Sequence, residues 1–220
     1  QILPEFEDYY GLMWRGAQNF EINDVGARDM LLRNDPGPDG RPHYVDVTAT
    51  AGISDGRYHG NSVTWWDFNH DGLPDLYVGN DFEDPDLLYR NNGNGTFSDI
   101  AVELNVGGPK RSFPVWFWDY NNDGALDLFV SSYSGGAGDF VHYFRGERLD
   151  DFSVASLYEG DGQGGFRNVV RERGLDVPMQ TMGSNFGDLD NDGFPDMYLG
   201  TGTPNYSDVV PNLLLVNRGG

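Results

Sequence analysis

The stretch "WWDFNHDGLPDLYVGN" (Trp65–Asn80) decides the fold, because it occurs three times in the chain. It returns as "FWDYNNDGALDLFVSS" (Phe117–Ser132) and as "FGDLDNDGFPDMYLGT" (Phe186–Thr201). In each copy an acidic, glycine-containing loop precedes a short apolar run such as "LYV", which is too short for a helix and typical of a β-strand. Each copy therefore predicts a strand, a loop and a second strand, and three copies predict a repeat architecture.

A second motif alternates with the first. Leu31–Thr48, Leu87–Ala101 and Ser156–Val170 place apolar runs on both sides of an Asn-Gly or Gly-rich turn, and a fourth copy begins at Asn212. This pattern is typical of β-hairpins. A hairpin joined to a strand–loop–strand unit gives four strands in about 55 residues, the size of a β-propeller blade. The units are expected at residues 31–79, 87–131 and 156–200, followed by half a hairpin.

The sequence thus predicts an all-β fold, a partial β-propeller of about three and a half four-stranded blades over residues 31–220. A closed ring of seven such blades needs roughly 400 residues. We therefore expect this chain to be part of a larger propeller, or a partner to supply the rest.

The three acidic loops share the spacing D-x-[DN]-x-D-G-x-x-D. Oxygens at positions 1, 3, 5 and 9, with the backbone carbonyl at position 7, can surround a hard cation that takes about six to eight oxygens, and the glycine at position 6 permits the bend. We predict one Ca²⁺ in each loop, about three ions in all. The predicted ligands are Asp67, Asn69, Asp71, Leu73 and Asp75; Asp119, Asn121, Asp123, Ala125 and Asp127; and Asp188, Asp190, Asp192, Phe194 and Asp196.

Other interpretations of the loops fit less well. An EF-hand has a bidentate Glu at position 12, where these loops have Val78, Val130 and Leu199 inside a predicted strand. Mg²⁺ prefers a rigid octahedron with retained waters, and Zn²⁺ prefers His or Cys ligands that this set does not contain. An acidic turn without metal is the remaining alternative, which threefold repetition disfavours.

The composition limits the possible partners. A net charge of -21 argues against binding to nucleic acid or to anionic membranes, and favours cations, although acidity also serves solubility. The chain contains no cysteine, which excludes disulfides and thiol chemistry. No apolar run approaches the length of a membrane span, so no membrane insertion is expected.

Two segments lie outside the repeats. Residues 1–30 form an N-terminal extension in which "EFEDYYGLMWRGAQNF" (Glu5–Phe20) is compatible with a short helix. The interval between the second and third acidic loops contains an insertion, residues 132–151, which we expect to project from a blade edge as a long loop.

Aromatic residues precede each acidic loop. Trp65 and Phe117 share the register of Phe186, so we expect all three on one buried face. Trp66 and Trp118 point to the other face and are the candidates for a contact surface. His70, at position 4 of the first loop, should face solvent.

The repeat resembles the FG-GAP/VCBS repeat, the blade of integrin-α-type β-propellers, most closely in "FGDLDNDGFPD" (Phe186–Asp196). In the other copies Trp66 and Trp118 replace the family's glycine. The hairpin "LLYRNNGNGTFSDIA" (Leu87–Ala101), together with the acidic loop, is similar to the cartilage-acidic-protein (ASPIC/UnbV-associated) group. The resemblance implies blades around a central axis, calcium loops between two strands of each blade, and an extracellular, cell-surface or periplasmic location.

Three functional hypotheses follow. The first is a calcium-binding extracellular module for adhesion, ligand binding or structural assembly, with a protein or glycan ligand at the cell surface or with self-association. The second is a catalytic or accessory propeller of a secreted polysaccharide-active enzyme, although the sequence contains no recognisable catalytic motif. The third is a subunit of a surface filament, joined through an open propeller edge.

Overall fold

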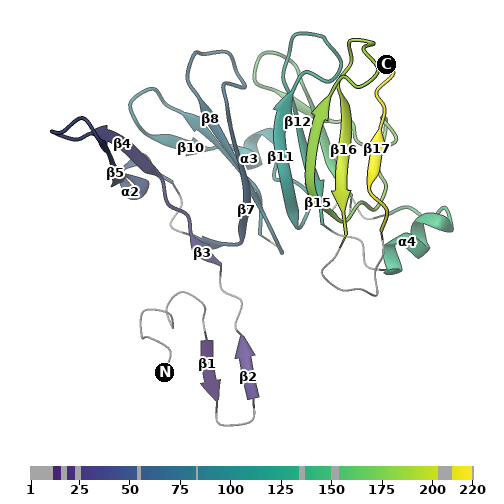
Figure 1. Ribbon diagram of the computed structural model, residues 1–220, viewed down its shortest axis with the longest axis horizontal. Coiled ribbons are helices and arrows are strands. Elements are labelled where there is room, and N and C mark those ends of the chain that lie inside the picture. Colours follow the sequence, from purple (N-terminus) through teal and green to yellow (C-terminus); the bar gives the residue numbers. More distant parts are fainter. Residues whose placement is uncertain are drawn as a thin grey trace.

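The computed structural model describes residues 12–15, 19–22, 26–53, 56–82, 84–133, 137–149, 154–202 and 210–219. The described chain is mainly β, with short helices, and its larger sheets are antiparallel and stand side by side (Figure 1). Within the described residues no helix is long and apolar enough to cross a membrane.

Three sheets form the centre of the molecule. The first sheet has the order β10-β9-β8-β7, the second β11-β12-β13-β14 and the third β15-β16-β17. Their strands are β7 (Gly60–Trp66), β8 (Asp75–Asn80), β9 (Leu87–Asn91) and β10 (Phe97–Asp99); β11 (Ser112–Trp118), β12 (Asp127–Ser132), β13 (Ser156–Gly160) and β14 (Phe166–Asn168); and β15 (Thr181–Gly187), β16 (Asp196–Thr201) and β17 (Leu213–Leu215).

The four-stranded units are therefore confirmed, but their predicted boundaries are wrong. Each acidic loop belongs to one sheet with the hairpin that follows it, because the strand after the loop pairs with the next strand along the chain, as β8 does with β9. The hairpin of β4 (Leu32–Pro36) and β5 (Pro42–Asp46) forms a separate two-stranded sheet. Short antiparallel connections favour pairing of neighbours in the sequence, and this explains the grouping.

The hairpins share a further feature, a turn of helix at their end. The helix α2 (Thr48–Ala51) follows β5, and α3 (Ala101–Leu104) follows β10. Both helices end at a residue in the left-handed conformation, Gly52 and Asn105, whose N–H groups close the last turn. The β4–β5 hairpin thus repeats the outer half of the first sheet.

The expected helix in the N-terminal extension is wrong where the structure describes that segment. The strands β1 (Leu12–Arg15) and β2 (Asn19–Ile22) pair as an antiparallel hairpin. The remainder of Glu5–Phe20 lies outside the described residues. Two further short strands, β3 (Ala27–Arg28) and β6 (Arg57–Tyr58), pair with each other.

The insertion contains a helix, where the sequence predicted a long loop. It contains the helix α4 (Ala137–Phe144), which Figure 1 places beside the lower end of the third sheet. The side chains of Tyr143 and Phe144 are 41% and 81% exposed. Residues 134–136 and 150–151 of the insertion are outside the described part.

The core lies between the sheets, because the central strands bury both faces. All six residues of β12 are buried. Leu128 and Val130 face the first sheet, whereas Phe129 faces the third, as the alternation of a strand requires. In the first sheet, Tyr77 faces the second sheet while its neighbour Leu76 packs toward the β4–β5 hairpin.

The aromatic predictions are only partly confirmed. Phe117 is 6% exposed and buried between the first and second sheets, but Trp65 and Phe186 are each 43% exposed. Trp66 is 50% exposed, which suits a contact surface. Trp118 is 5% exposed, because the third sheet covers it and brings Phe186 to 5.2 Å between ring centroids, so its assignment to a surface is wrong.

Candidate metal centre

The three acidic loops occupy the same place in their sheets. They connect β7 to β8, β11 to β12 and β15 to β16, and Figure 1 shows these turns at one edge of the molecule. The strand pairs that flank them end in equivalent registers, with Trp66 opposite Asp75 and Trp118 opposite Asp127. The loops are therefore held by rigid strands on both sides.

The backbone of the loops is the same three times. Position 4 is left-handed in each, with φ of 58° at His70, 58° at Asn122 and 61° at Asn191. Position 6 is a glycine with φ between 85° and 92°. Only glycine adopts the conformation found at position 6 without steric cost, so the bend of the loop depends on this glycine. His70 is exposed, as predicted.

The carboxylate at position 1 organises each loop. In the first loop, Asp67 accepts hydrogen bonds from the N–H groups of Asp71 at 3.0 Å and Gly72 at 2.9 Å. Asp119 and Asp188 accept the equivalent bonds at 3.0–3.1 Å. Each bond uses one lone pair of its oxygen, which leaves capacity on the same atoms for a cation.

The carboxylate at position 9 ties the loop to the next hairpin. Asp75 is fully buried; it accepts the N–H of Phe68 on one oxygen at 3.3 Å and that of Asn91 on the other at 2.8 Å. The second and third loops repeat this arrangement, with Gly160 and Asn217 in the place of Asn91.

Burial without a countercharge perturbs two of these groups. The pKa of Asp75 is raised to about 6 and that of Asp127 to about 7, mainly by desolvation and in part by the neighbouring loop carboxylates, against the lowering effect of the backbone bonds. Ionised carboxylates in such a place favour a nearby cation, because a cation offsets both the desolvation and the mutual repulsion.

The donor set fits a hard cation. In the third loop, carboxylate oxygens of Asp188, Asp190 and Asp196 lie within 4.8 Å of one another, and the first two residues are exposed. The first and second loops have an amide at position 3, Asn69 and Asn121, in the same hydrogen-bonded frame. All these donors are oxygens, the ligands that Ca²⁺ prefers.

The position-5 carboxylates bond instead to the chain at position 7. Asp71, Asp123 and Asp192 each accept the N–H of the position-7 residue at 2.8–2.9 Å. The position-7 side chains lie toward the tip of the following hairpin. A Cβ added to Gly219, for example, would stand 2.4 Å from the ring of Phe194. The three loops thus share one backbone frame, whereas coordination of a cation by the predicted ligands stays a prediction.

Some contributing residues were missed from the sequence. Glu159 on β13 accepts a hydrogen bond from Nδ2 of Asn121 at 3.1 Å, and the side chains of Asn122 and Asn217 reach a neighbouring loop. Asn91 and Asn217 both follow an apolar run and precede a turn, a repeated signal that could have singled them out. No local pattern marks Glu159, because β13 is distant from the loop in sequence.

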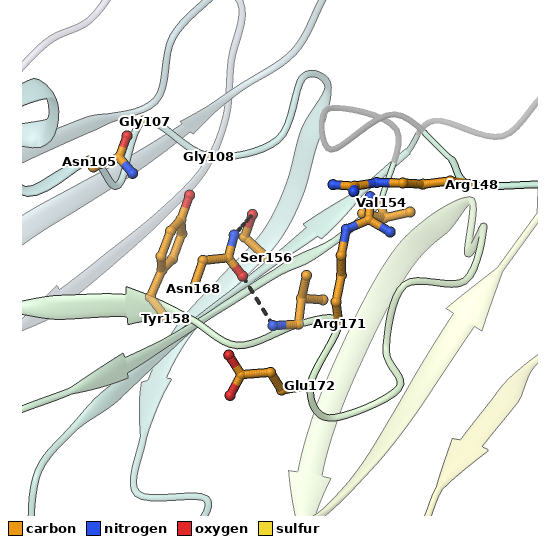
Figure 2. A pocket seen from close by; sticks show the side chains of 11 residues that line it. Asn105, Gly107, Gly108, Arg148, Val154, Ser156, Tyr158, Asn168, Arg171 and Glu172 are labelled. Atoms are coloured by element: carbon orange, nitrogen blue, oxygen red, sulfur yellow. Dashed lines mark hydrogen bonds between the residues drawn. The ribbon is translucent and has the colours of Figure 1, made fainter.

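A cavity of about 560 Å³ lies elsewhere, lined in part by the segment after α3 and by the outer strands of the second sheet (Figure 2). Asn168, which lines it, donates to Ser156 at 3.2 Å and accepts the N–H of Val170 at 3.1 Å. Arg171, at its rim, is paired with Asp176. None of the predicted metal ligands lines this cavity.

Comparison with known proteins agrees with the repeated loops. Residues 67–130, which contain the first two loops, match the FG-GAP-like repeat family. The chain is 29% identical over 200 residues to cartilage acidic protein 1 of Homo sapiens, covering 86% of this chain and 28% of the relative. It is 31% identical over 170 residues to cartilage acidic protein 1 of Xenopus tropicalis, covering 69% and 26%.

The chain therefore spans less than a third of the length of these curated relatives. The acidic loops, the antiparallel four-stranded sheets and the family match together identify the chain as an FG-GAP repeat protein.

Proposed function

We propose that the chain is a calcium-stabilised β-propeller module of extracellular type, in which each acidic loop holds one Ca²⁺ between two strands. The observation that carries this proposal is the threefold repetition of one loop frame, with oxygen donors at the same positions and a buried carboxylate at position 9. The position-9 acid also ties the loop to the next hairpin, but desolvation of its charge is unfavourable, and a cation in the loop would offset that cost.

In this proposal the ion joins each loop to the hairpin of its own sheet. The position-9 carboxylate would contact the ion while it holds the N–H of Asn91, Gly160 or Asn217. Binding to the folded state alone stabilises that state, so calcium would take the place of disulfides in a chain that has no cysteine.

The biological role that we propose is adhesion, ligand binding or structural assembly outside the cell, with a protein or glycan partner or with a second copy. The similarity to cartilage acidic protein 1 and the acidic surface support this class. The roles as a polysaccharide-active enzyme and as a filament subunit remain predictions, since no feature of the described residues favours either.

Thermal unfolding with millimolar calcium and with a chelator tests the proposal. We expect calcium to raise the melting temperature, and magnesium at the same concentration to raise it less, because Mg²⁺ keeps its waters. A melting temperature that does not respond to calcium would contradict the proposed function.

A further inference from the structure

Two hydrogen bonds join the second acidic loop to the third sheet, one of them directly to the third acidic loop. The side-chain amide of Asn122, at position 4 of the second loop, donates to the carbonyl oxygen of Gly193, at position 6 of the third loop, at 2.7 Å. The side-chain amide of Asn217, which follows β17, donates to the carbonyl oxygen of Tyr120 in the second loop, also at 2.7 Å. Two separate contacts therefore link one candidate site to the next.

The first contact leads directly to a predicted ligand. The peptide group between Gly193 and Phe194 accepts from Asn122 through its carbonyl, and its N–H donates to Asp192 at 2.9 Å. A peptide group is planar and rigid, so fixing its N–H also fixes the direction of its carbonyl. Asn122 in turn lies between the predicted ligands at positions 3 and 5 of the second loop.

The second contact joins the two position-9 carboxylates. The N–H of Asn217 donates to Asp196 at 2.8 Å, while its side chain holds the carbonyl of Tyr120. The N–H of Tyr120 then donates to Asp127 at 3.1 Å. A chain of hydrogen bonds through Asn217 and Tyr120 thus connects Asp196 with the equivalent acid of the second loop.

The first loop lacks both contacts. Its position 4 is His70, which is exposed, and the residue equivalent to Asn217 in the second sheet is Gly160, which has no side chain. Residues 67–75 and 119–127 are all described, and no hydrogen bond joins these two loops. Asn91 occupies the same position in the first sheet. Its side chain donates to Pro74 of its own sheet at 3.0 Å, as the side chain of Asn217 also does to Pro195 at 3.3 Å.

We propose that the second and third loops bind Ca²⁺ as a coupled pair, in which filling one raises the affinity of the other, whereas the first loop binds independently. This inference rests on the calcium function proposed above. A cation in the third loop would order Asp192 and Asp196, and through Asn122 and Asn217 it would order the second loop in advance. The second ion then meets a smaller entropic cost of ordering.

Calcium titration by calorimetry on the full chain tests the coupling. Asp67→Ala combined with Asp71→Ala disables the first loop and leaves a two-site protein. In this background we expect the second binding step to be at least about fivefold tighter than an independent site would be. Adding Asn122→Ala and Asn217→Ala should remove this cooperativity, with two independent binding steps remaining.

The matched controls are His70→Ala and Asn91→Ala, which truncate the equivalent side chains of the first sheet. They should leave the cooperativity unchanged. Two non-cooperative sites in the starting background, or cooperativity that survives loss of both amides, would overturn the coupling while calcium binding stands. Absence of calcium binding in the unaltered protein would instead overturn the proposed function. Circular dichroism of each variant establishes that it is folded.

Discussion

The hydroxyl of Tyr77 lies 2.9 Å from Oδ2 of Asp86, and the third sheet repeats this pair with Tyr198 and the amide of Asn212, also 2.9 Å apart. The equivalent residues of the second sheet are both apolar, Phe129 and Ala155. The two sheets that have a tyrosine at this position thus have a polar residue beside its hydroxyl, whereas the sheet that has a phenylalanine there has an apolar residue.

Asp86 is 1% exposed, and burial raises its pKa to about 7. Its Oδ2 also receives the hydroxyl of Ser112 at 2.7 Å, while the hydroxyl of Tyr77 lies 2.8 Å from the carbonyl of Val106. A hydroxyl has one hydrogen to donate. A protonated Asp86 can donate its own hydrogen to the Tyr77 oxygen, so that the Tyr77 hydroxyl donates to the carbonyl of Val106. The side-chain amide of an asparagine at position 86 could donate in the same way.

Asp86→Asn should therefore flatten the dependence of stability on pH. A carboxyl whose pKa is raised on folding lowers the free energy of unfolding as pH rises from about 4 to about 7, and the loss persists above that range. The nearby titratable groups, Tyr77 and Tyr158, have raised pKa values and stay neutral there.

Denaturant unfolding of both proteins at pH 5 and pH 8 measures this effect. From pH 5 to pH 8 we expect the free energy of unfolding of the variant to rise by a few kcal/mol relative to that of the natural protein. Tyr77→Phe, which removes a hydrogen bond but keeps the acid, should not flatten the profile. An equal change for Asp86→Asn at both pH values would show that Asp86 is ionised throughout.

Asp119→Ala should reduce the stabilisation by calcium, because Asp119 both supports the second loop and supplies a predicted ligand. A filled site adds roughly 1–3 kcal/mol when calcium is well above its dissociation constant. Asp161→Ala is the matched control: Asp161 also accepts two backbone N–H groups in a turn, at 2.8 Å each, but lies outside the loops. Melting curves with and without calcium should differ less for Asp119→Ala than for Asp161→Ala.

Glu159→Ala should weaken calcium binding at the second loop by about tenfold, because partners that orient a ligand commonly have effects of this size. Glu159 holds Asn121 and also pairs with Arg167 at 2.7 Å. Glu172→Ala removes another partner of Arg167 without touching the loop, and should leave the affinity unchanged. Calorimetric titration distinguishes the two, and equal affinities would exclude the orienting role.

Phe129→Ala should destabilise the protein by about 3–5 kcal/mol, since its ring is fully buried between the second and third sheets. Tyr198→Ala changes the equivalent position of β16, where the side chain is 49% exposed, and should cost far less. Denaturant unfolding midpoints compare them directly. Similar losses would mean that the outer face of the third sheet is covered in solution.

Local patterns in the sequence were sufficient to predict the strands and hairpin turns of the repeats and the frame of the three loops, but not the strands of the N-terminal extension. The loop bends depend on residues within nine positions of one another, so Gly72 and Asp67 act together in any copy of the motif. The short apolar run after the loop likewise predicts a strand such as Asp127–Ser132 without knowledge of its neighbours.

Tertiary structure alone decided which faces are covered and which loops meet. Trp66 and Trp118 hold equivalent places in the repeat, yet only Trp118 is buried, because burial depends on the sheet that packs against the residue. The bond from Asn122 to Gly193 spans 71 positions. Sequence spacing cannot predict such contacts, since they form only where residues of different sheets are packed side by side.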